Sequence, residues 1–326
     1  EAGGADRHPY IHIPLGLGPM HARRLFDWGY EGEPEPELNG RRIEAMRGKV
    51  LGGSSSINVM AFTRGSPGDY DRWARNGAAG WSYDEVLPYF KRVERWEGGE
   101  SRWRGGSGYV GVEWAKTTDP LFDAWIEAGK AAGYGYTEDY NGAQSWGFGR
   151  GQYSIRDGYR SSSANAYLRP ARGRRNLSVE TRALATRILF EGARAGGVEY
   201  VQGGQTKHAM ADGEIILSGG TFNTPQLLML SGIGPADHLR AMGIAARLDL
   251  PVGENLQDHW AVQLMYARRE AGPFRAVMRA DRMTLGMARA YLFGKGPATV
   301  VPGGLHAFLR TDESRDVPDL EFMFRG

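Results

Sequence analysis

The alternation of apolar and polar residues first predicts a set of helices. Several segments repeat apolar residues at the helical period of about 3.6, with start or stop signals at their ends. Ser82 and Glu85 form a capping box ahead of an apolar run, which predicts that a helix begins there. Gly133 and Gly294 follow two other periodic runs and predict where those helices end. The predicted helices cover residues 68–74, 82–90, 119–130, 162–168, 221–231, 235–243 and 283–293.

From residue 177 the pattern changes to short runs that are typical of strands. These runs predict a meander over residues 177–181, 185–190, 197–201 and 205–209, then a buried strand at 214–218 and a last strand at 318–324. Residues 5–46 are rich in Pro, Gly, Arg and aromatic side chains without periodicity, which predicts a long loop or lid. Pro9 and Pro14 argue against a helix around His8 and His12.

Candidate chemistry lies in residues 47–62, where an apolar step at Val50 runs into Gly52, Gly53 and three serines. Because glycine has no Cβ, paired glycines let a backbone approach a ligand closely. Successive backbone N–H groups and serine hydroxyls at the start of a helix favour an anion such as a diphosphate. The alternative for this sequence is a glycine-rich turn with a serine cap.

A second block has a similar character. Residues 214–220 predict a buried strand that runs into a glycine turn, and residues 221–231 predict the helix that follows. Thr224 suits the N-cap of that helix and Pro225 its first helical position, while Gly232 predicts its end. The order strand, glycine turn, helix is thus expected here.

With Arg64, Gly65 and Asp71 behind it, the first block resembles the first signature of the glucose–methanol–choline (GMC) family of FAD-dependent oxidoreductases. The second block is similar to the second signature, in family order and at about family spacing. Glu1 resembles the acidic residue that ends the second strand of a dinucleotide-binding fold and binds the ribose. The resemblance implies an α/β plus α+β fold. In it, a Rossmann-like FAD-binding domain is interleaved with a substrate domain built on an antiparallel sheet, here incomplete.

The resemblance also implies FAD as the cofactor and a set of residues that cradle it. Val50 is expected near the diphosphate or the ring system, residues 58–61 against the flavin, and the backbone of Ala185 at the adenine edge. Ile57 stands where some family members carry the histidine that attaches FAD, so we predict a non-covalent cofactor. The predicted cofactor-binding residues are Glu1, Val50, Gly52, Gly53, Ser54, Asn58, Val59, Met60, Ala61 and Ala185.

The activity implied by the resemblance is oxidation of an alcohol, in which a base removes the hydroxyl proton and the carbon gives hydride to flavin N5. In the family the base is a histidine close to the C-terminus. We expect this chain to be a fragment that lacks that region and the first βαβ segment, so we assign no catalytic residue. We expect the isolated chain to hold FAD weakly and to be inactive. A hydroxynitrile lyase that contains FAD and an inactive remnant are the alternatives.

Two further motifs are not predicted to have a function of their own. Residues 106–111 spell G-x-G-x-x-G, but no strand precedes them and a strand pattern follows, whereas a phosphate loop needs strand, turn and helix. His259 lies in a further stretch that resembles the family, and we expect it to be a structural, hydrogen-bonded histidine. The other histidines show no metal-ligand spacing, so no metal site is predicted.

Composition bounds the remaining possibilities. The net charge of +2 gives no nucleic-acid footprint, and the absence of cysteine excludes disulfides and thiolate metal sites. No run of apolar residues is long enough to predict a membrane span. We expect a small-molecule alcohol as the substrate and a cytoplasmic location, and the oligomeric state stays open. The 326 residues suggest two interleaved domains. We predict an FAD-binding domain at 1–105 and 176–260, and a substrate domain at 106–175 and 261–326.

Overall fold

The computed structural model describes residues 1–325, with the side chain of Ala276 left aside. The chain forms two compact units, which are described separately. Unit 1 comprises Glu1–Ala5 and Ser178–Ala267, and unit 2 comprises Asp6–Leu177 and Arg268–Gly326. These units differ from the predicted domains because residues 6–105 group with the segment that follows them. The assignment of an FAD domain and a substrate domain stays a prediction. The last residue of the predicted substrate domain, Gly326, lies outside the described residues.

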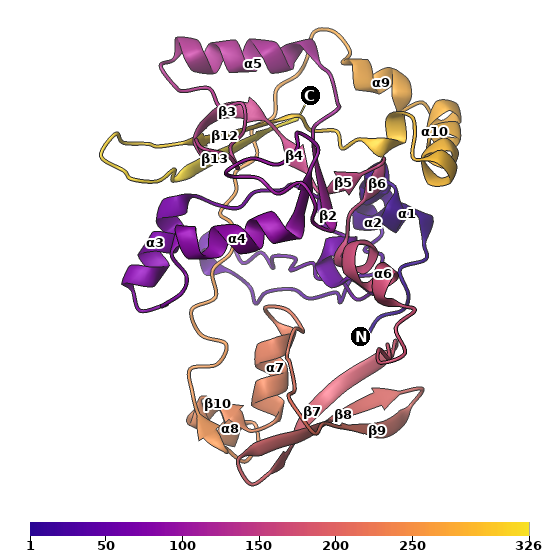
Figure 1. Ribbon diagram of the computed structural model, residues 1–326, viewed down its shortest axis with the longest axis vertical. Helices are drawn as coiled ribbons and strands as arrows, with labels where there is room; N and C mark the ends of the chain where they lie inside the picture. The colour runs from indigo at the N-terminus through magenta and orange to yellow at the C-terminus, as the bar shows by residue number, and fades with distance from the viewer. Residues whose placement is uncertain (326) are drawn as a thin grey trace. The chain divides into compact units, whose positions relative to one another are not determined.

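Unit 1 is built on an antiparallel meander (Figure 1). Its strands are β7 (Ala183–Glu191), β8 (Arg194–Gln202) and β9 (Gln205–Met210). The two-residue loop between β8 and β9 is Gly203-Gly204, and both residues have positive φ, 59° and 77°. This backbone matches the twist of a tight hairpin, which explains the paired glycines. The meander agrees with the sequence prediction, except that residues 177–181 form no strand.

The rest of unit 1 follows the meander, and its elements are α7 (Asn223–Leu230), β10 (Ile233–Gly234), α8 (Ala236–Ala241) and β11 (Leu248–Asp249). The strand predicted at 214–218 is absent, because those residues pair with no strand of the described chain and Ile216 is 81% exposed. The prediction of Thr224 as N-cap is also wrong. The helix begins at Asn223, and Thr224 Oγ1 accepts a hydrogen bond from the Gly219 N–H at 3.0 Å.

The start of unit 2 contains more helix than the sequence predicts. Its short elements are α1 (Pro9–His12), η1 (Pro14–Gly16), α2 (Leu17–Ala22), η2 (Pro36–Leu38) and η3 (Gly53–Ser56). The prediction against a helix at His8 to His12 is wrong because Pro9 occupies the first helical position, where its missing N–H does no harm. His8 Nδ1 caps the helix by accepting from the Tyr10 N–H at 3.2 Å. Residues 23–46 carry only isolated bridges and one 3-10 turn, as expected of a loop.

The remaining helices of unit 2 are α3 (Pro67–Arg75), α4 (Tyr83–Val93), α5 (Pro120–Ala131), η4 (Ala164–Leu168), α6 (Arg169–Ala171), α9 (Pro273–Val277), α10 (Ala280–Phe293) and η5 (Pro297–Thr299). The predicted capping box of Ser82 and Glu85 is present at α4. Gly294 ends α10 in the left-handed conformation, at φ 62°. The start of α4 and the end of α10 were therefore predicted correctly from the sequence.

Three small sheets give unit 2 its framework. The strands are β1 (Glu94–Trp96), β2 (Val110–Trp114), β3 (Gly147–Arg150), β4 (Gln152–Tyr153), β5 (Ile155–Arg156), β6 (Tyr159–Arg160), β12 (Leu305–Leu309) and β13 (Leu320–Phe324). Residues 106–111 run into β2, so the G-x-G-x-x-G motif precedes a strand as predicted. In the order β13-β12-β3 the sheet is antiparallel, and α5 packs on it through Trp125 and Ile126 (Figure 1).

Candidate functional site

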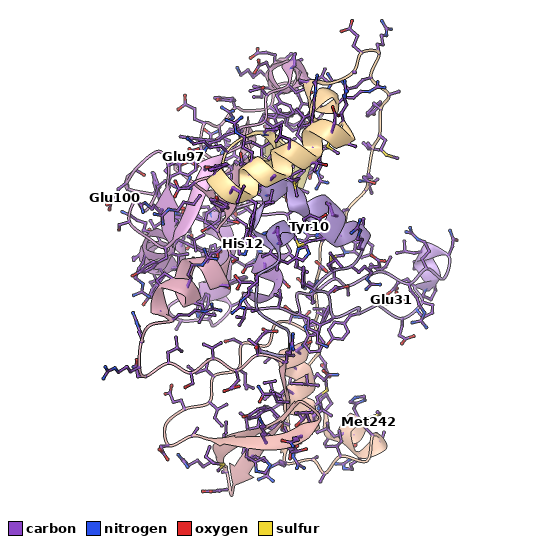
Figure 2. The ribbon with its side chains drawn as sticks, turned by 90° about the vertical axis from the view of Figure 1, so that its right-hand side faces the viewer. Tyr10, His12, Glu31, Glu97, Glu100 and Met242 are labelled. Atoms are coloured by element: carbon purple, nitrogen blue, oxygen red, sulfur yellow. The ribbon has the colours of Figure 1, made fainter. Side chains whose placement is uncertain are left out.

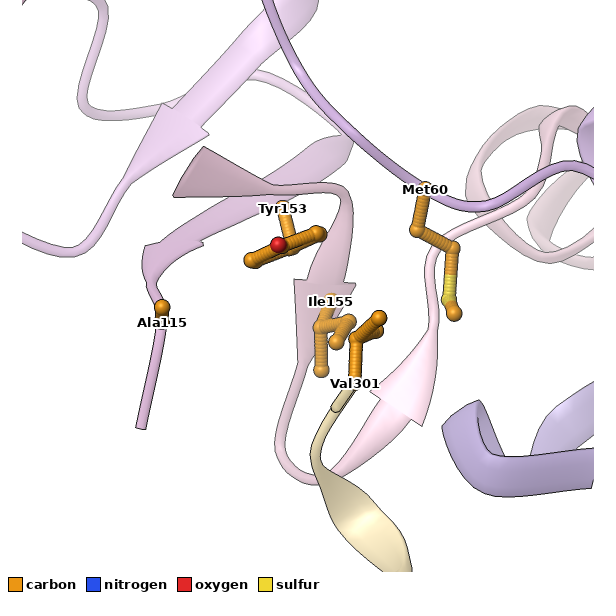
Figure 3. Close-up of a cluster of buried hydrophobic side chains, with 5 residues drawn as sticks. All are labelled: Met60, Ala115, Tyr153, Ile155 and Val301. Carbon is orange, nitrogen blue, oxygen red and sulfur yellow. The ribbon is translucent and has the colours of Figure 1, made fainter. Parts of the chain in front are cut away.

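Residues 50–61, here called the glycine–serine segment, connect two hydrophobic clusters of unit 2. At one end, Val50 and Ile57 are buried with Ile11 and Met20. At the other end, Met60 is buried with a group that contains Ala115, Tyr153, Ile155 and Val301 (Figure 3). The apolar residues of the segment therefore hold it to the protein at both ends. Its conformation is set by packing as well as by its glycines.

The turn at the start of the segment uses glycine where a side chain would not fit. Gly52 has φ 89°, and a Cβ there would lie 3.1 Å from the Cβ of Ala164. Gly53 has φ 53°, and a Cβ there would meet no atom within 4 Å, so its Cα side is open. A Cβ on Gly48 would lie 2.4 Å from the carbonyl carbon of Gly53, which explains that glycine as well.

The serine hydroxyls mostly serve the turn itself. Ser55 Oγ donates to the Gly52 carbonyl at 2.6 Å, and Ser56 Oγ donates to the Leu51 carbonyl at 2.7 Å. Ser54 Oγ accepts from the Gly48 N–H at 3.0 Å, which leaves its own proton free to donate. The helix is a four-residue 3-10 turn and the Gly53 N–H donates to the Val50 carbonyl, so the expected helix-start anion site reduces to the Ser54 hydroxyl.

The segment has one buried face and one open face. Val50, Ser56, Ile57 and Met60 are buried. Ser54 and Asn58 are exposed, and Gly52, Gly53, Val59 and Ala61 are partly exposed. The structure therefore separates the predicted cofactor residues into two that anchor the segment, Val50 and Met60, and a set that could touch a ligand.

Asn58 is oriented by Arg160, a residue that the sequence analysis did not select. Arg160 Nη1 donates to the Asn58 carbonyl at 2.7 Å and to Asn58 Oδ1 at 2.8 Å. Asn58 Oδ1 also accepts from the Met60 N–H at 3.1 Å. Because Oδ1 has two donors, the Nδ2 amide of Asn58 is the part left for a ligand. The sequence signal that could have drawn attention to Arg160 is the Asp157-Gly158 turn just before it.

Arg160 itself is 1% exposed, and burial lowers the pKa of its guanidinium to about 10. Its Nε donates to the Ile11 carbonyl at 2.9 Å, while its Nη2 has no partner among the described residues. The group remains a cation at neutral pH. It ties the N-terminal helix to the glycine–serine segment through main-chain carbonyls.

After Asn58 the chain runs alongside β4 and bonds to its edge. Met60 has φ 64°, which is uncommon for a residue with a side chain. The Ser154 N–H donates to the Met60 carbonyl at 2.8 Å, and the Phe62 N–H donates to the Gln152 carbonyl at 2.9 Å. These bonds place Val59 and Ala61 beside a small cavity of about 20 Å³.

A buried ionic network holds the chain just beyond the segment. Arg64 contacts Glu94, and Arg104 Nε donates to Glu94 Oε1 at 2.9 Å. Arg104 Nη1 also reaches Asp139 Oδ1 at 2.6 Å. Glu94 is fully buried, so its charge needs both guanidinium groups. The network fixes the exit of the glycine–serine segment.

The other two predicted residues lie in unit 1. The Ala183 N–H donates to the Glu1 carbonyl at 2.9 Å, so the chain start runs along β7. Glu1 Oε1 accepts from the Gly3 N–H at 2.7 Å. Ala185 is exposed and pairs with Tyr200 at a register shift between Ala185 and Arg187. Such a bulge leaves backbone groups unpaired, which suits a backbone contact with a ligand.

Other predicted features lie apart from the glycine–serine segment. His259 is exposed, and its backbone N–H donates to Asp258 Oδ1 at 2.8 Å. The imidazole of His259 makes no hydrogen bond with the described residues, so the expected role as a structural, hydrogen-bonded histidine is not met. A cavity of about 310 Å³ in unit 2 is lined by groups that include His12 and Ala164, and His12 extends from α1 near Tyr10 (Figure 2). Burial lowers the pKa of His12, against a raising effect of Asp6.

The sequence of this chain matches a known protein family. The model of the GMC oxidoreductase family matches residues 15–261, so this chain is a member of the GMC oxidoreductases. The predicted resemblance to the GMC family and the predicted GMC fold are confirmed. The chain is 47% identical over 335 residues to an oxygen-dependent choline dehydrogenase from Rhizobium etli, an alignment that covers 99% of this chain and 59% of that protein. The chain thus spans about 59% of the length of this curated relative.

Solved structures give the same result. Pyridoxine 4-oxidase from Mesorbium loti matches with a TM-score of 0.81 and 31% identity, over 96% of this chain and 57% of that one. An FAD-dependent oxidoreductase from Chaetomium thermophilum matches with a TM-score of 0.81 and 30% identity, over 94% and 56%. In residues 1–325, no helix has the length and apolar character needed to cross a membrane.

Proposed function

We propose that this chain provides the FAD cradle of an enzyme that oxidises an alcohol. The observation that carries the proposal is the two-sided glycine–serine segment, which is anchored through Val50 and Met60 and open at Gly53, Ser54 and Asn58. FAD, when bound, supplies the acceptor for the hydride of the alcohol carbon. Family membership and the FAD-dependent structural relative support this choice of cofactor.

The open face fits a nucleotide cofactor in its chemistry. A Cβ on Gly53 would meet no atom within 4 Å, although its N–H already donates to the Val50 carbonyl at 2.8 Å, and Ser54 keeps a hydroxyl proton to donate. Asn58 presents an Nδ2 amide, because Arg160 and the Met60 N–H hold its oxygen. These donors suit acceptor atoms of a diphosphate or a flavin ring. Ile57 is an inert, buried side chain, which supports a non-covalent cofactor.

In unit 1 we assign two further contacts to the adenosine end of FAD. Glu1 uses one carboxylate oxygen for the Gly3 N–H, and the second oxygen remains for a ribose hydroxyl. Ala185 is an exposed residue beside Thr186, which the register shift leaves without a ladder partner, and we assign this stretch of backbone to the adenine edge. We further place the protein in the cytoplasm and take a small alcohol as its substrate. The choline dehydrogenase and pyridoxine oxidase among its relatives support an alcohol substrate.

The test measures flavin binding and flavin reduction in the complete natural gene product that contains this chain. We expect a yellow protein whose flavin absorbance bleaches anaerobically when choline, benzyl alcohol or pyridoxine is added. Asn58→Ala should weaken FAD binding by about 10-fold, the usual effect of losing one hydrogen bond in a buried site. Asn176→Ala, at an exposed position of the same unit, is the matched control.

Two results would contradict the proposal. Cyanide release from mandelonitrile without flavin reduction by any alcohol would indicate the lyase alternative. A folded protein that binds no FAD would indicate an inactive remnant.

A further inference from the structure

Buried arginines of unit 2 differ in what balances their positive charge. Arg64 and Arg104 share the carboxylate of Glu94, and Arg104 also pairs with Asp139. Arg160 is 1% exposed and forms no ion pair within the described residues. A buried cation without a counter-charge is costly to keep in a folded protein. The charge of Arg160 is therefore left for a negative group that the described chain does not supply.

Main-chain carbonyls hold the Arg160 guanidinium in place. Its Nε donates to the Ile11 carbonyl at 2.9 Å, while its Nη1 donates to the carbonyls of Ser55 at 3.3 Å and Asn58 at 2.7 Å. Carbonyl oxygens carry only partial negative charge, so they orient the cation without neutralising it. Although burial lowers the pKa of Arg160 to about 10, the group keeps its proton at neutral pH. The result is a fixed positive charge next to Asn58.

Asn58 connects this charge to the open face of the glycine–serine segment. Arg160 Nη1 and the Met60 N–H both donate to Asn58 Oδ1, at 2.8 and 3.1 Å, which fixes the amide with its oxygen toward the two donors. The Asn58 N–H donates to the Ser54 carbonyl at 2.8 Å, so Nδ2 is the part of Asn58 without a partner among the described residues. Hydrogen bonds in a chain polarise one another, so a cation on Oδ1 makes Nδ2 a stronger donor.

We propose that Arg160 is a positioning residue that acts through Asn58 on the flavin ring of FAD and favours its reduced state. A hydride brings one negative charge to the ring that accepts it, and a donor that is already in place stabilises charge as it develops. The bond from the Asn58 amide is therefore stronger to the reduced ring than to the oxidised ring. The inference rests on the proposed function for the cofactor and for the place of Asn58 against the flavin. No proton or electron passes through either side chain.

The diphosphate of FAD is the alternative partner for this chain of hydrogen bonds. Its charge is the same in oxidised and reduced FAD, so an arginine that served it would raise the affinity for both states equally. The ring gains its charge on reduction, so an arginine that serves the ring raises the affinity for reduced FAD more. We favour the ring because the Ser54 hydroxyl already offers the diphosphate a donor. By thermodynamic linkage, the ratio of the two affinities sets the reduction potential of bound FAD.

The first test measures that potential in the complete natural gene product, by reductive titration against a reference dye. Arg160→Met removes the charge, so we expect the oxidised state to gain about 10-fold over the reduced state, which lowers the potential of a two-electron couple by about 30 mV. Arg160→Lys keeps a positive charge and should retain most of the potential. Arg174→Met, at an exposed position of the same unit, is the matched control and should leave the potential unchanged.

A second variant tests the connection through Asn58 and serves where Arg160→Met fails to fold. Asn58→Asp keeps an oxygen for the two donors of Asn58 and replaces the Nδ2 donor with negative charge. We expect the oxidised state to gain at least about 10-fold over the reduced state, the same direction as in Arg160→Met. Affinity for oxidised and for reduced FAD, measured separately, gives the same ratio.

A third variant separates the charge of Arg160 from its support of the fold. Met20→Ala removes a buried side chain that packs with Val50, so it loosens the same segment and changes no charge. We expect this variant to lower stability and to leave the potential of bound FAD unchanged. A purely structural Arg160 would instead make the potential follow stability, with Met20→Ala and Arg160→Lys both shifted.

Four results would count against the inference. Equal losses of affinity for oxidised and reduced FAD in Arg160→Met would overturn it in favour of the diphosphate. Potential shifts of equal size in Met20→Ala and Arg160→Met would assign the effect to the fold. An unchanged potential in Arg160→Met and Asn58→Asp, in a protein whose FAD is still reduced by benzyl alcohol, would refute the inference and leave the proposed function intact. A folded natural gene product that binds no FAD would contradict the proposed function itself, and the inference with it.

Discussion

The two glycine-containing signatures of this chain look alike in sequence and differ in structure. In residues 50–61 the apolar residues are buried, and Val50 and Met60 are both 0% exposed. In residues 214–220 the apolar run has no ladder partner within the described chain, and Ile216 is 81% exposed. The first signature is held by two clusters and by Arg160, and the second ends in a helix whose start is shifted.

The difference teaches that an apolar run becomes a strand only where another strand accepts its hydrogen bonds. A buried backbone N–H or carbonyl without a partner is costly, so the run at 214–218 stays open. In the glycine–serine segment, side chains supply the hydrogen bonds that a neighbouring strand would supply. Arg160 and the serine hydroxyls donate to its backbone carbonyls. Local pattern is therefore a weaker guide than the availability of partners.

The largest expected loss of stability tests whether Arg160 holds the glycine–serine segment. Arg160→Met leaves the carbonyls of Ile11, Ser55 and Asn58 without their donor, and we expect a loss of about 3 kcal/mol in the free energy of unfolding. Urea unfolding followed by circular dichroism measures it. Arg174→Met, at an exposed position, should change stability by less than about 0.5 kcal/mol. Equal effects in the two variants would show that Arg160 does not hold the segment.

The next effect tests packing of the same segment. Val50→Ala removes two buried carbon atoms and leaves a cavity against Ile11 and Met20, so we expect a loss of about 2 kcal/mol. The urea midpoint should fall while the denaturant dependence stays the same. A loss below about 0.5 kcal/mol would indicate that the cluster does not anchor the segment.

A pH experiment compares the two units through different groups. Burial lowers the pKa of His12 in unit 2 below its ordinary value of 6.5, so the unfolded chain binds a proton first as the pH falls. The stability of unit 2 should therefore decrease below about pH 6.5 through this group, and His12→Gln should remove that part of the decrease. The pKa of Glu199 in unit 1 is lowered by its hydrogen bond from Thr186, so its stabilising contribution is present above the ordinary value of 4.5 and is lost only as the pH falls below it. Amide hydrogen exchange, read unit by unit, checks both windows. A His12→Gln chain with the same loss at pH 6 would contradict the assignment.

The smallest effect belongs to the second signature. Ile216→Ala should change the free energy of unfolding by less than about 0.5 kcal/mol, because the side chain is 81% exposed. The same urea experiment, compared with Val50→Ala, measures it. If Ile216→Ala costs as much as Val50→Ala, the second signature is packed in solution and the comparison fails.

Prediction from the sequence succeeded where the signal was local. The capping box at Ser82 and the glycine stop at Gly294 both lie where expected. The meander was legible from its alternation and its paired glycines. One failure came from a partner far along the chain, because the run at 214–218 lacks a neighbouring strand among the described residues. The other was local, since Pro9 begins a helix where the two prolines argued against one.

The candidate site divides in the same way. The sequence alone pointed to the glycines, Ser54 and Asn58, because their residue types and spacing carry the resemblance to the family. Only the tertiary structure brought Arg160 onto Asn58 and onto the carbonyl of Ile11. These contacts join residues more than 100 positions apart, and no local pattern encodes which distant side chain fills a given space. The sequence thus determined where the chain turns at its glycines, because that preference is local, and packing decided which groups those segments leave open.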